Sequence, residues 1–197
     1  PTLPNGPTSS RSRVPSRTEP SQPADTVAFQ LNGQTVSVPD SSGQSLLDVL
    51  RNTLQLKATR LGCGQGQCGA CHVLVNGQSV AACETPLWAI QDKSVTTLEG
   101  LGNRASPHPL QTAFIEEQAL QCGFCTSGIL VSAAALLQRQ AHPTREEIVH
   151  MLDRHLCRCG AHNRVLRAIE KVAAATAASA TTAAAGTRAV SPGDGQP

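Results

Sequence analysis

The sequence has few of the residues that build large cores or stack on nucleic-acid bases. Its 197 residues include no tyrosine, one tryptophan and three phenylalanines, so aromatic residues make up only 2%. Hydrophobic residues still reach 40%, which permits a packed core. A small core that is poor in aromatic side chains needs another source of stability, and bound metal is a common one.

An excess of one charge is also missing. The net charge is +2, and residues 1–24 account for all of it, because they hold three arginines and one glutamate. The rest of the chain keeps 13 of the 16 basic and 13 of the 14 acidic residues. With no basic stripe and few aromatic side chains, the sequence argues against nucleic acid as a partner.

Long apolar runs are absent as well. No segment approaches the roughly 20 apolar residues of a membrane span. The arginines near the start are not followed by the apolar segment of a secretory signal, and they form no twin-arginine pair. We therefore expect no membrane insertion and no targeting signal. The expected location is the cytoplasm, or the periplasm or a membrane surface if a partner subunit carries the chain there.

Composition divides the chain into four segments. Residues 1–24 are rich in Pro, Ser, Thr and Arg, and residues 178–197 are mostly Ala, Thr, Gly and Pro. Both segments lack the apolar residues of a core, so we predict disordered tails. Residues 25–101 have an α+β pattern, and residues 102–177 have a helical one.

The α+β segment contains two predicted hairpins. Residues 27–38 alternate in hydropathy around Asn32-Gly33, and residues 72–83 do so around Asn76-Gly77. Between them, residues 46–54 have helical spacing after Ser45, a predicted N-cap. Residues 94–98 predict one more strand. In the second segment, helical spacing predicts four helices over residues 109–119, 127–138, 144–152 and 163–174, which favours a small bundle. Thr144 and Glu147 form a predicted capping box.

The chemistry lies in eight cysteines, which form two sets of four. They are Cys63-x4-Cys68-x2-Cys71-x11-Cys83 and Cys122-x2-Cys125-x31-Cys157-x-Cys159. A [2Fe–2S] cluster needs four thiolates, and the first spacing is that of plant-type ferredoxins. Glycines around the first set permit a tight loop whose N–H groups point toward sulfur. The second set precedes two predicted helices, whose N-termini favour an anionic cluster.

Two other interpretations of the cysteines remain. A disulfide framework is possible, but it does not explain the glycines, and Cys157 and Cys159 are too close in sequence to pair easily. Two structural zinc sites are the stronger rival, because CxxC pairs are typical of zinc. They would make the chain a zinc-stapled binding module without a redox role. A free two-cluster ferredoxin is a third possibility. The six histidines have no metal-ligand spacing and are interpreted as surface, capping or supporting residues.

Three motifs resemble the iron–sulfur subunit of the xanthine oxidase family, the molybdenum hydroxylases. They are LGCGQGQCGAC (61–71), QCGFCT (121–126) and LCRCG (156–160). The resemblance implies a β-grasp, ferredoxin-like domain followed by a four-helix bundle, each with one [2Fe–2S] cluster. It also implies a large partner subunit that binds molybdopterin and converts the substrate, so that this chain only relays electrons. By the same resemblance, Gln121 and Cys159 lie beside the pterin.

Other features resemble the nicotinate, isoquinoline and aldehyde dehydrogenase branch of that family. They are residues 161–167 and residues 86–88. The branch implies the cytosine dinucleotide form of molybdopterin and a c-type cytochrome as acceptor. The substrate is an aldehyde or an N-heteroaromatic compound. Three residues depart from the usual family pattern: His72, Ser127 and His155 stand where a small residue, a proline and an asparagine are common.

Overall fold

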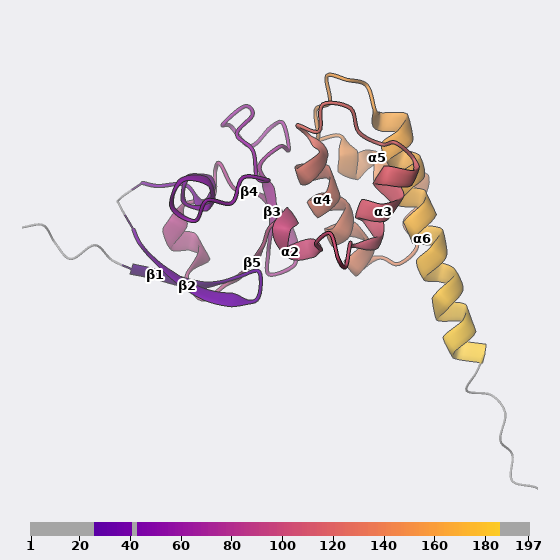
Figure 1. Cartoon of the computed structure of the whole chain (residues 1–197), viewed down its shortest axis with the longest axis horizontal. Helices are drawn as coiled ribbons and strands as arrows, with labels where there is room; N and C mark the ends of the chain where they lie inside the picture. Colours follow the sequence, from indigo (N-terminus) through magenta and orange to yellow (C-terminus); the bar gives the residue numbers. More distant parts are fainter. Residues whose placement is uncertain (1–25, 41–42, 186–197) are drawn as a thin grey trace, which may run out of the picture.

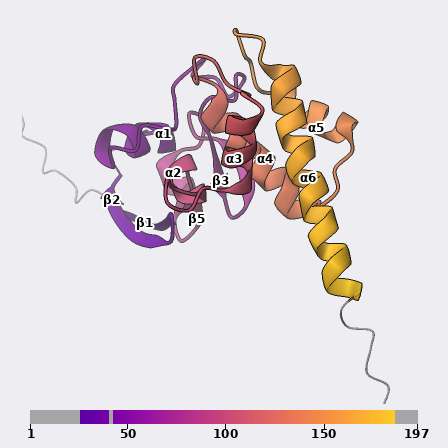
Figure 2. The same cartoon turned by 45° about the vertical axis from the view of Figure 1, so that its right-hand side comes forward.

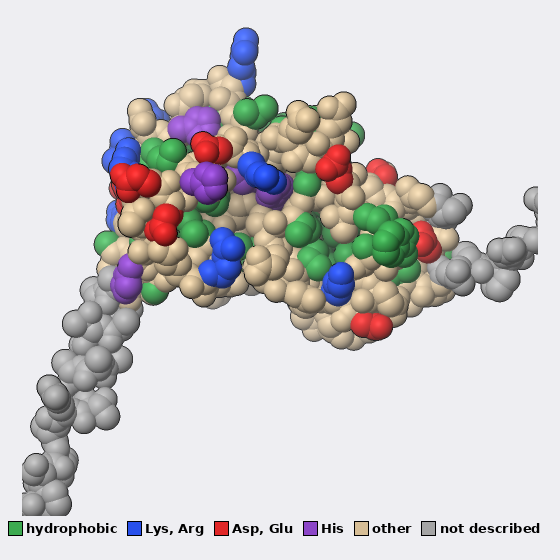
Figure 3. Space-filling model, turned by 180° about the vertical axis from the view of Figure 1, so that it is seen from behind, with side chains coloured by type: hydrophobic (Ala, Val, Ile, Leu, Met, Phe, Trp, Pro, Cys, Tyr) green, Lys and Arg blue, Asp and Glu red, His purple; other side chains and the backbone are tan. Residues whose placement is uncertain are grey.

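The computed structural model describes residues 26–40 and 43–185, which form a small sheet region and a helical region side by side (Figure 1). The predicted tail at residues 1–24 and the last part of the second tail, residues 186–197, lie outside the described residues. Within the described part, no helix combines the length and apolarity needed to cross a bilayer. The face opposite to Figure 1 has acidic and basic side chains interspersed (Figure 3).

The sheet is mixed and five-stranded, in the order β2-β1-β5-β3-β4. Strands β1 (Thr26–Leu31) and β2 (Gln34–Pro39) form one antiparallel hairpin, and β3 (His72–Val75) and β4 (Gln78–Ala81) form the other. The short β5 (Ser94–Thr96) lies between them, parallel to β1 and antiparallel to β3. Both predicted hairpins are confirmed.

The hairpin turns explain the pairing. Asn32 and Gly33 have φ of 51° and 83°, and Asn76 and Gly77 have φ of 49° and 77°. Two successive left-handed residues match the twist of the flanking strands, and Asn-Gly adopts them at little steric cost. The second strand of the second hairpin ends at Ala81, two residues before the predicted end, which leaves Cys83 in a loop.

One face of the sheet is covered by a short helix. Helix α1 (Leu46–Asp48) continues into a single π-helical stretch, η1 (Val49–Thr53), and buries Leu46, Leu47 and Leu50 in the sheet's core. The Ser45 hydroxyl accepts a hydrogen bond from the Asp48 N–H, as the predicted N-cap requires. The 3-10 helix η2 (Leu87–Ile90) and helix α2 (Leu98–Leu101) were not predicted, because four residues carry no helical period.

The second region holds four longer helices. They are α3 (Pro109–Glu116), α4 (Thr126–Arg139), α5 (Arg145–Leu152) and α6 (His162–Ala185). The Thr144 capping box at the start of α5 is confirmed. Helix α3 ends earlier than predicted, since Gln118 adopts a φ of 49°. Helix α6 continues through residues 178–185, where a tail was predicted, and that stretch is rich in alanine, the strongest helix former.

Each region has its own hydrophobic core. Helix α6 packs between α3 and α5 around a core that includes Phe114, Ile129 and Ile169 (Figure 2). A third, smaller cluster of Leu74, Val131 and Ala135 joins strand β3 to helix α4. Helix α4 therefore faces the helical core on one side and the sheet on the other, and it is buried along most of its length.

Candidate metal centres

The first set of cysteines is gathered by the loop before β3. Cys63, Cys68 and Cys71 lie on this loop, and Cys83 follows β4. The four thiols interact as two neighbouring pairs: Cys63 with Cys68, and Cys71 with Cys83. A [2Fe–2S] cluster uses two thiolates on each iron, so this two-by-two pairing fits its ligand chemistry.

Backbone N–H groups of the same loop point inward. Gln65 and Gln67 donate to the Cys63 sulfur, and Gly66 donates to the Cys83 sulfur, each at 3.3 Å. The Gln65 and Gln67 donors lower the pKa of the Cys63 thiol to about 7. Because an N–H group stabilises negative charge on sulfur, the loop already favours the thiolate form that iron requires.

Two glycines allow the loop to close this tightly. A Cβ atom on Gly62 would lie 2.5 Å from the Cys68 sulfur, and one on Gly66 would collide with the Glu84 carboxylate. Gly66 also has a φ of +66°, which side-chain-bearing residues rarely adopt. The glycines of the motif therefore leave room for sulfur and for the turning backbone.

The second set lies at two helix N-termini, as predicted. Cys125 is the residue that precedes α4, and Cys157 and Cys159 lie just before α6. The thiols again form two pairs, Cys122 with Cys159 and Cys125 with Cys157. Burial acts to raise the pKa of Cys157, but N–H groups of the turn into α6, led by Ala161, outweigh it and lower the pKa.

One thiol in each set is strongly protonated without metal. Burial raises the pKa of Cys71 and of Cys125 to about 12, and the neighbouring thiols Cys83 and Cys157 add to the effect. A metal ion reverses this balance, because a coordinated thiol is deprotonated. Within the described residues, no three His, Cys, Asp or Glu side chains are placed to hold a single metal ion.

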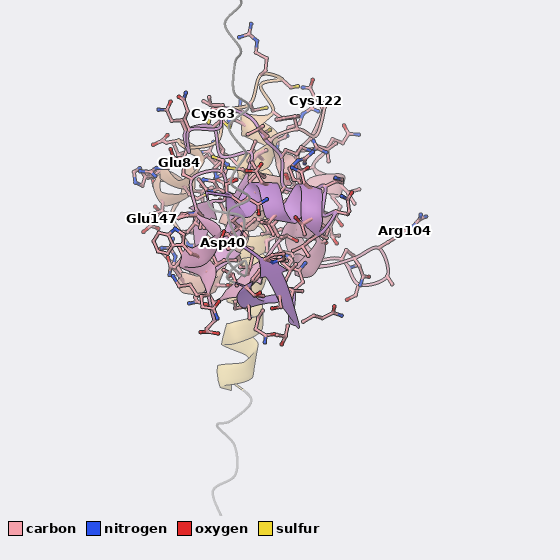
Figure 4. The ribbon with its side chains drawn as sticks, turned by 90° about the vertical axis from the view of Figure 1, so that its left-hand side faces the viewer. Asp40, Cys63, Glu84, Arg104, Cys122 and Glu147 are labelled. Atoms are coloured by element: carbon pink, nitrogen blue, oxygen red, sulfur yellow. The ribbon has the colours of Figure 1, made fainter. Side chains whose placement is uncertain are left out.

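Members of both cysteine sets line one hollow at an end of the molecule: Cys63 and Cys68 of the first set, and Cys122, Cys125 and Cys157 of the second. Figure 4 shows Cys63 and Cys122 at this end, and the hollow between their loops has a volume of about 600 Å³. Phe124 and Leu156 line this hollow, and Leu61 directly precedes its lining residue Gly62; the Phe124, Leu156 and Leu61 side chains are 46%, 67% and 57% exposed. Apolar side chains gathered around one opening are typical of a surface that a partner covers.

Backbone contacts hold the two loops against each other. The Leu156 N–H donates to the Cys68 carbonyl at 3.1 Å. The Arg60 guanidinium donates to the Gly123 carbonyl at 2.6 Å and lies 5.5 Å from the centre of the Phe124 ring. The loops of the two sets are thus joined directly, and not only through the chain between them.

The structure also places the predicted pterin residues and the histidines. The Gln121 side-chain amide donates to the Cys159 carbonyl at 3.1 Å, so these two residues are adjacent. His108 caps α3, where its Nδ1 accepts from the Leu110 N–H. His72 and His155 were not expected to meet, yet their rings lie 4.9 Å apart at the junction of the two regions. Their only signal in the sequence is that both depart from the family pattern.

Comparisons with known proteins define the class of the chain. Residues 29–97 match the family model of the 2Fe–2S iron–sulfur cluster binding domain, and residues 97–170 match that of the [2Fe–2S] binding domain. The chain is therefore a tandem of two [2Fe–2S] domains, the first of them ferredoxin-like. It belongs to the iron–sulfur subunits of the xanthine oxidase family, and so it is an iron–sulfur subunit of an oxidoreductase.

Individual relatives support this assignment. The chain is 47% identical to one of the nicotinate dehydrogenase subunits of Pseudomonas putida, over 75% of this chain and 94% of that protein. It is 46% identical to the alpha subunit of isoquinoline 1-oxidoreductase from Brevundimonas diminuta, over 75% and 97%. The aldehyde oxidoreductase structure from Desulfovibrio desulfuricans aligns with a TM-score of 0.75 and 40% identity, covering 78% of this chain but 17% of that one.

Proposed function

We propose that this chain relays electrons from molybdopterin in a large partner subunit to an external acceptor, through two bound [2Fe–2S] clusters. The observation that carries the proposal is that the fold gathers four cysteines around the loop before β3 and four more at the turns into α4 and α6, with members of both sets lining one hollow. When bound, the clusters supply one-electron redox chemistry. The zinc-stapled module is not favoured, because both family models describe [2Fe–2S] domains and two relatives are named as iron–sulfur subunits.

All eight cysteines are proposed as the ligands. Cys63, Cys68, Cys71 and Cys83 would hold the cluster of residues 25–101, which we propose to be a β-grasp domain. Cys122, Cys125, Cys157 and Cys159 would hold the cluster of residues 102–177, a four-helix bundle. The inward N–H groups and the helix N-termini would then stabilise the negative charge of each cluster and adjust its potential.

The large subunit is proposed to cover the hollow between the loops. The exposed Phe124 and Leu156 support this, since they line the hollow beside members of both cysteine sets. Gln121 and Cys159 lie at the loop of the second set and are proposed to contact the pterin, in its cytosine dinucleotide form. The names of the relatives support an aldehyde or an N-heteroaromatic substrate on that subunit, and we propose a c-type cytochrome as acceptor.

Single-ligand variants of the complex test the relay. Electrons are proposed to enter at the Cys122 set and leave from the Cys63 set. Replacing Cys125 with Ser should therefore stop electrons at molybdenum. Replacing Cys68 with Ser should let substrate reduce molybdenum and the inner cluster, but should block transfer to the acceptor. Rapid-freeze EPR shows which centre accumulates electrons.

The iron and sulfide content of the protein provides the control for this experiment. Two clusters require about four irons and four sulfides per chain in the unmodified protein. Each variant must also retain the spectrum of its remaining cluster, because cluster binding is coupled to folding. Stoichiometric zinc without iron would contradict the function, and normal turnover of the Cys68 variant would contradict the order.

A further inference from the structure

Four polar side chains from both regions meet in the junction between them. Ser132 of α4 is at the centre: its Oγ lies 2.9 Å from His155 Nε2, 3.1 Å from His72 Nδ1 and 2.7 Å from Ser79 Oγ. The Ser79 hydroxyl also lies 2.8 Å from His72 Nδ1. We call these four residues the junction network.

The junction network is closed to solvent at its centre. His155 and Ser132 are only 2% and 3% exposed, and His72 is also buried. A hydroxyl donates one hydrogen bond and accepts up to two, so Ser132 can accept from His155 Nε2–H and donate its single proton to either His72 Nδ1 or Ser79 Oγ on the sheet. Buried polar groups need such partners, and Ser132 reaches His72 and Ser79 across the junction only when the two regions sit in one arrangement. The Nδ1 atom of His155 has no hydrogen-bond partner within the described residues.

Both ends of the junction network are tied to cysteine ligands. His72 follows Cys71 directly, and His155 precedes Cys157 by two residues. The hydrogen bonds thus link one proposed ligand of each cluster across the junction, by way of a single serine. Shifting Ser132 or either histidine would move the backbone that carries these ligands.

The backbone at the same place is packed too closely for adjustment. A Cβ atom on Gly69 would lie 2.5 Å from the Arg154 carbonyl and would also collide with His155. A Cβ atom on Gly128 would collide with the Gly69 carbonyl. The neighbouring apolar contact of Leu74 with Val131 and Ala135 has no direction of its own, so the hydrogen bonds and this close backbone packing together determine the orientation.

We propose that the junction network fixes the separation and orientation of the two clusters and so sets the rate of electron transfer between them. This inference rests on the proposed function, because it requires a cluster at each set of cysteines. Ser79, His72, Ser132 and His155 act as positioning residues, and none of them is proposed as a ligand.

A matched pair of serine variants tests the proposal in the full chain loaded with both clusters. Ser132→Ala removes the central hydroxyl. Ser127→Ala makes the same change in the same helix at a similarly buried site, 4% exposed, but the Ser127 hydroxyl has no hydrogen-bond partner within the described residues. The electron is introduced by a flash-generated one-electron reductant, at less than one electron per chain. Its redistribution between the clusters is then followed optically.

The two variants should differ in transfer rate and in the magnetic interaction between clusters. Electron transfer between two centres slows steeply as their separation grows, so a shift of the two regions in Ser132→Ala should slow transfer severalfold. The EPR splitting between the two reduced clusters should change as well. Ser127→Ala should match the unmodified chain in both measurements.

Histidine variants provide the rescue. His155→Gln retains an N–H donor close to the Nε2 position and should transfer at nearly the normal rate, whereas His155→Leu should be as slow as Ser132→Ala. If Ser132→Ala fails to hold both clusters, Ser79→Ala takes its place. It removes only the half-buried hydroxyl and should still slow transfer.

Two results separate the junction network from the relay itself. If Ser132→Ala lost stability but kept its transfer rate and EPR splitting unchanged, the proposed role of the junction network would be overturned. The proposed relay would be left intact. An unmodified chain that holds no iron, or in which no electron passes between the clusters, would instead overturn the proposed function.

Discussion

Replacing Gly69 with alanine should destabilise the protein far more than the same change at Gly64. Both glycines lie in the first cysteine loop, with φ of +75° and +70°, so each alanine costs about 1 kcal/mol for the left-handed backbone. At Gly64 the added Cβ meets only the Leu61 side chain, at an ordinary 3.7 Å. At Gly69 it meets the Arg154 carbonyl at 2.5 Å and collides with His155.

The difference between the two variants measures the close approach of the loops. Forced overpacking costs about 1–3 kcal/mol, so the Gly69 variant should lose roughly 2–4 kcal/mol in total. For a chain of this length, 1 kcal/mol shifts Tm by roughly 2–4 °C, which predicts a gap of roughly 2–12 °C between the variants. Thermal scans of both cluster-loaded variants at one scan rate test this. Equal Tm values would refute the proposed packing of the first loop against residues 154–155.

Three further predictions concern other parts of the chain. Thr144→Ala removes the N-cap of α5 and should cost about 1 kcal/mol in denaturant unfolding, whereas Thr144→Ser should cost little. Burial lowers the pKa of His108, whose Nδ1 must stay unprotonated to cap α3. The unfolded state therefore binds more protons below about pH 6.5, so stability should fall as pH drops through that value, and less so in His108→Asn. Arg60→Met removes the hydrogen bond to Gly123 and should cost about 1–3 kcal/mol, with no change in iron content.

The features predicted from the sequence are those that short segments specify. Asn32-Gly33 and Asn76-Gly77 determine the two hairpins, because the left-handed turn is a property of the pair itself. The spacing of Cys63, Cys68 and Cys71 likewise needs only a nine-residue loop. The Thr144 capping box is equally local, with both of its hydrogen bonds formed within four residues.

The features that were missed depend on residues far apart in the chain. His72 and Ser132 are separated by 60 positions, and no periodicity brings them together. The histidines were interpreted one at a time, so their meeting at the junction could not be foreseen. Helix α2 was missed for a different reason: its leucines pack against the helical core and the small cluster of Leu74, Val131 and Ala135, and its four residues have no pattern of their own.

The long-range contacts between the two regions also determine how these regions can move relative to each other. Two rigid domains joined by a linker would normally be expected to shift relative to each other. Here the Leu156 N–H donates a hydrogen bond to the Cys68 carbonyl. Ser132 of helix α4 also lies within hydrogen-bond distance of His72 and His155. Leu156 adjoins the proposed ligand Cys157, and Cys68 is itself a proposed ligand. Ser132 lies on helix α4, which begins directly after the proposed ligand Cys125. A relative motion large enough to change the distance between the clusters would therefore have to break hydrogen bonds that join the two cysteine loops or the two regions. In the unmodified chain those bonds should persist while both clusters are bound, so the two regions are expected to move as one unit unless a residue of the junction network is replaced.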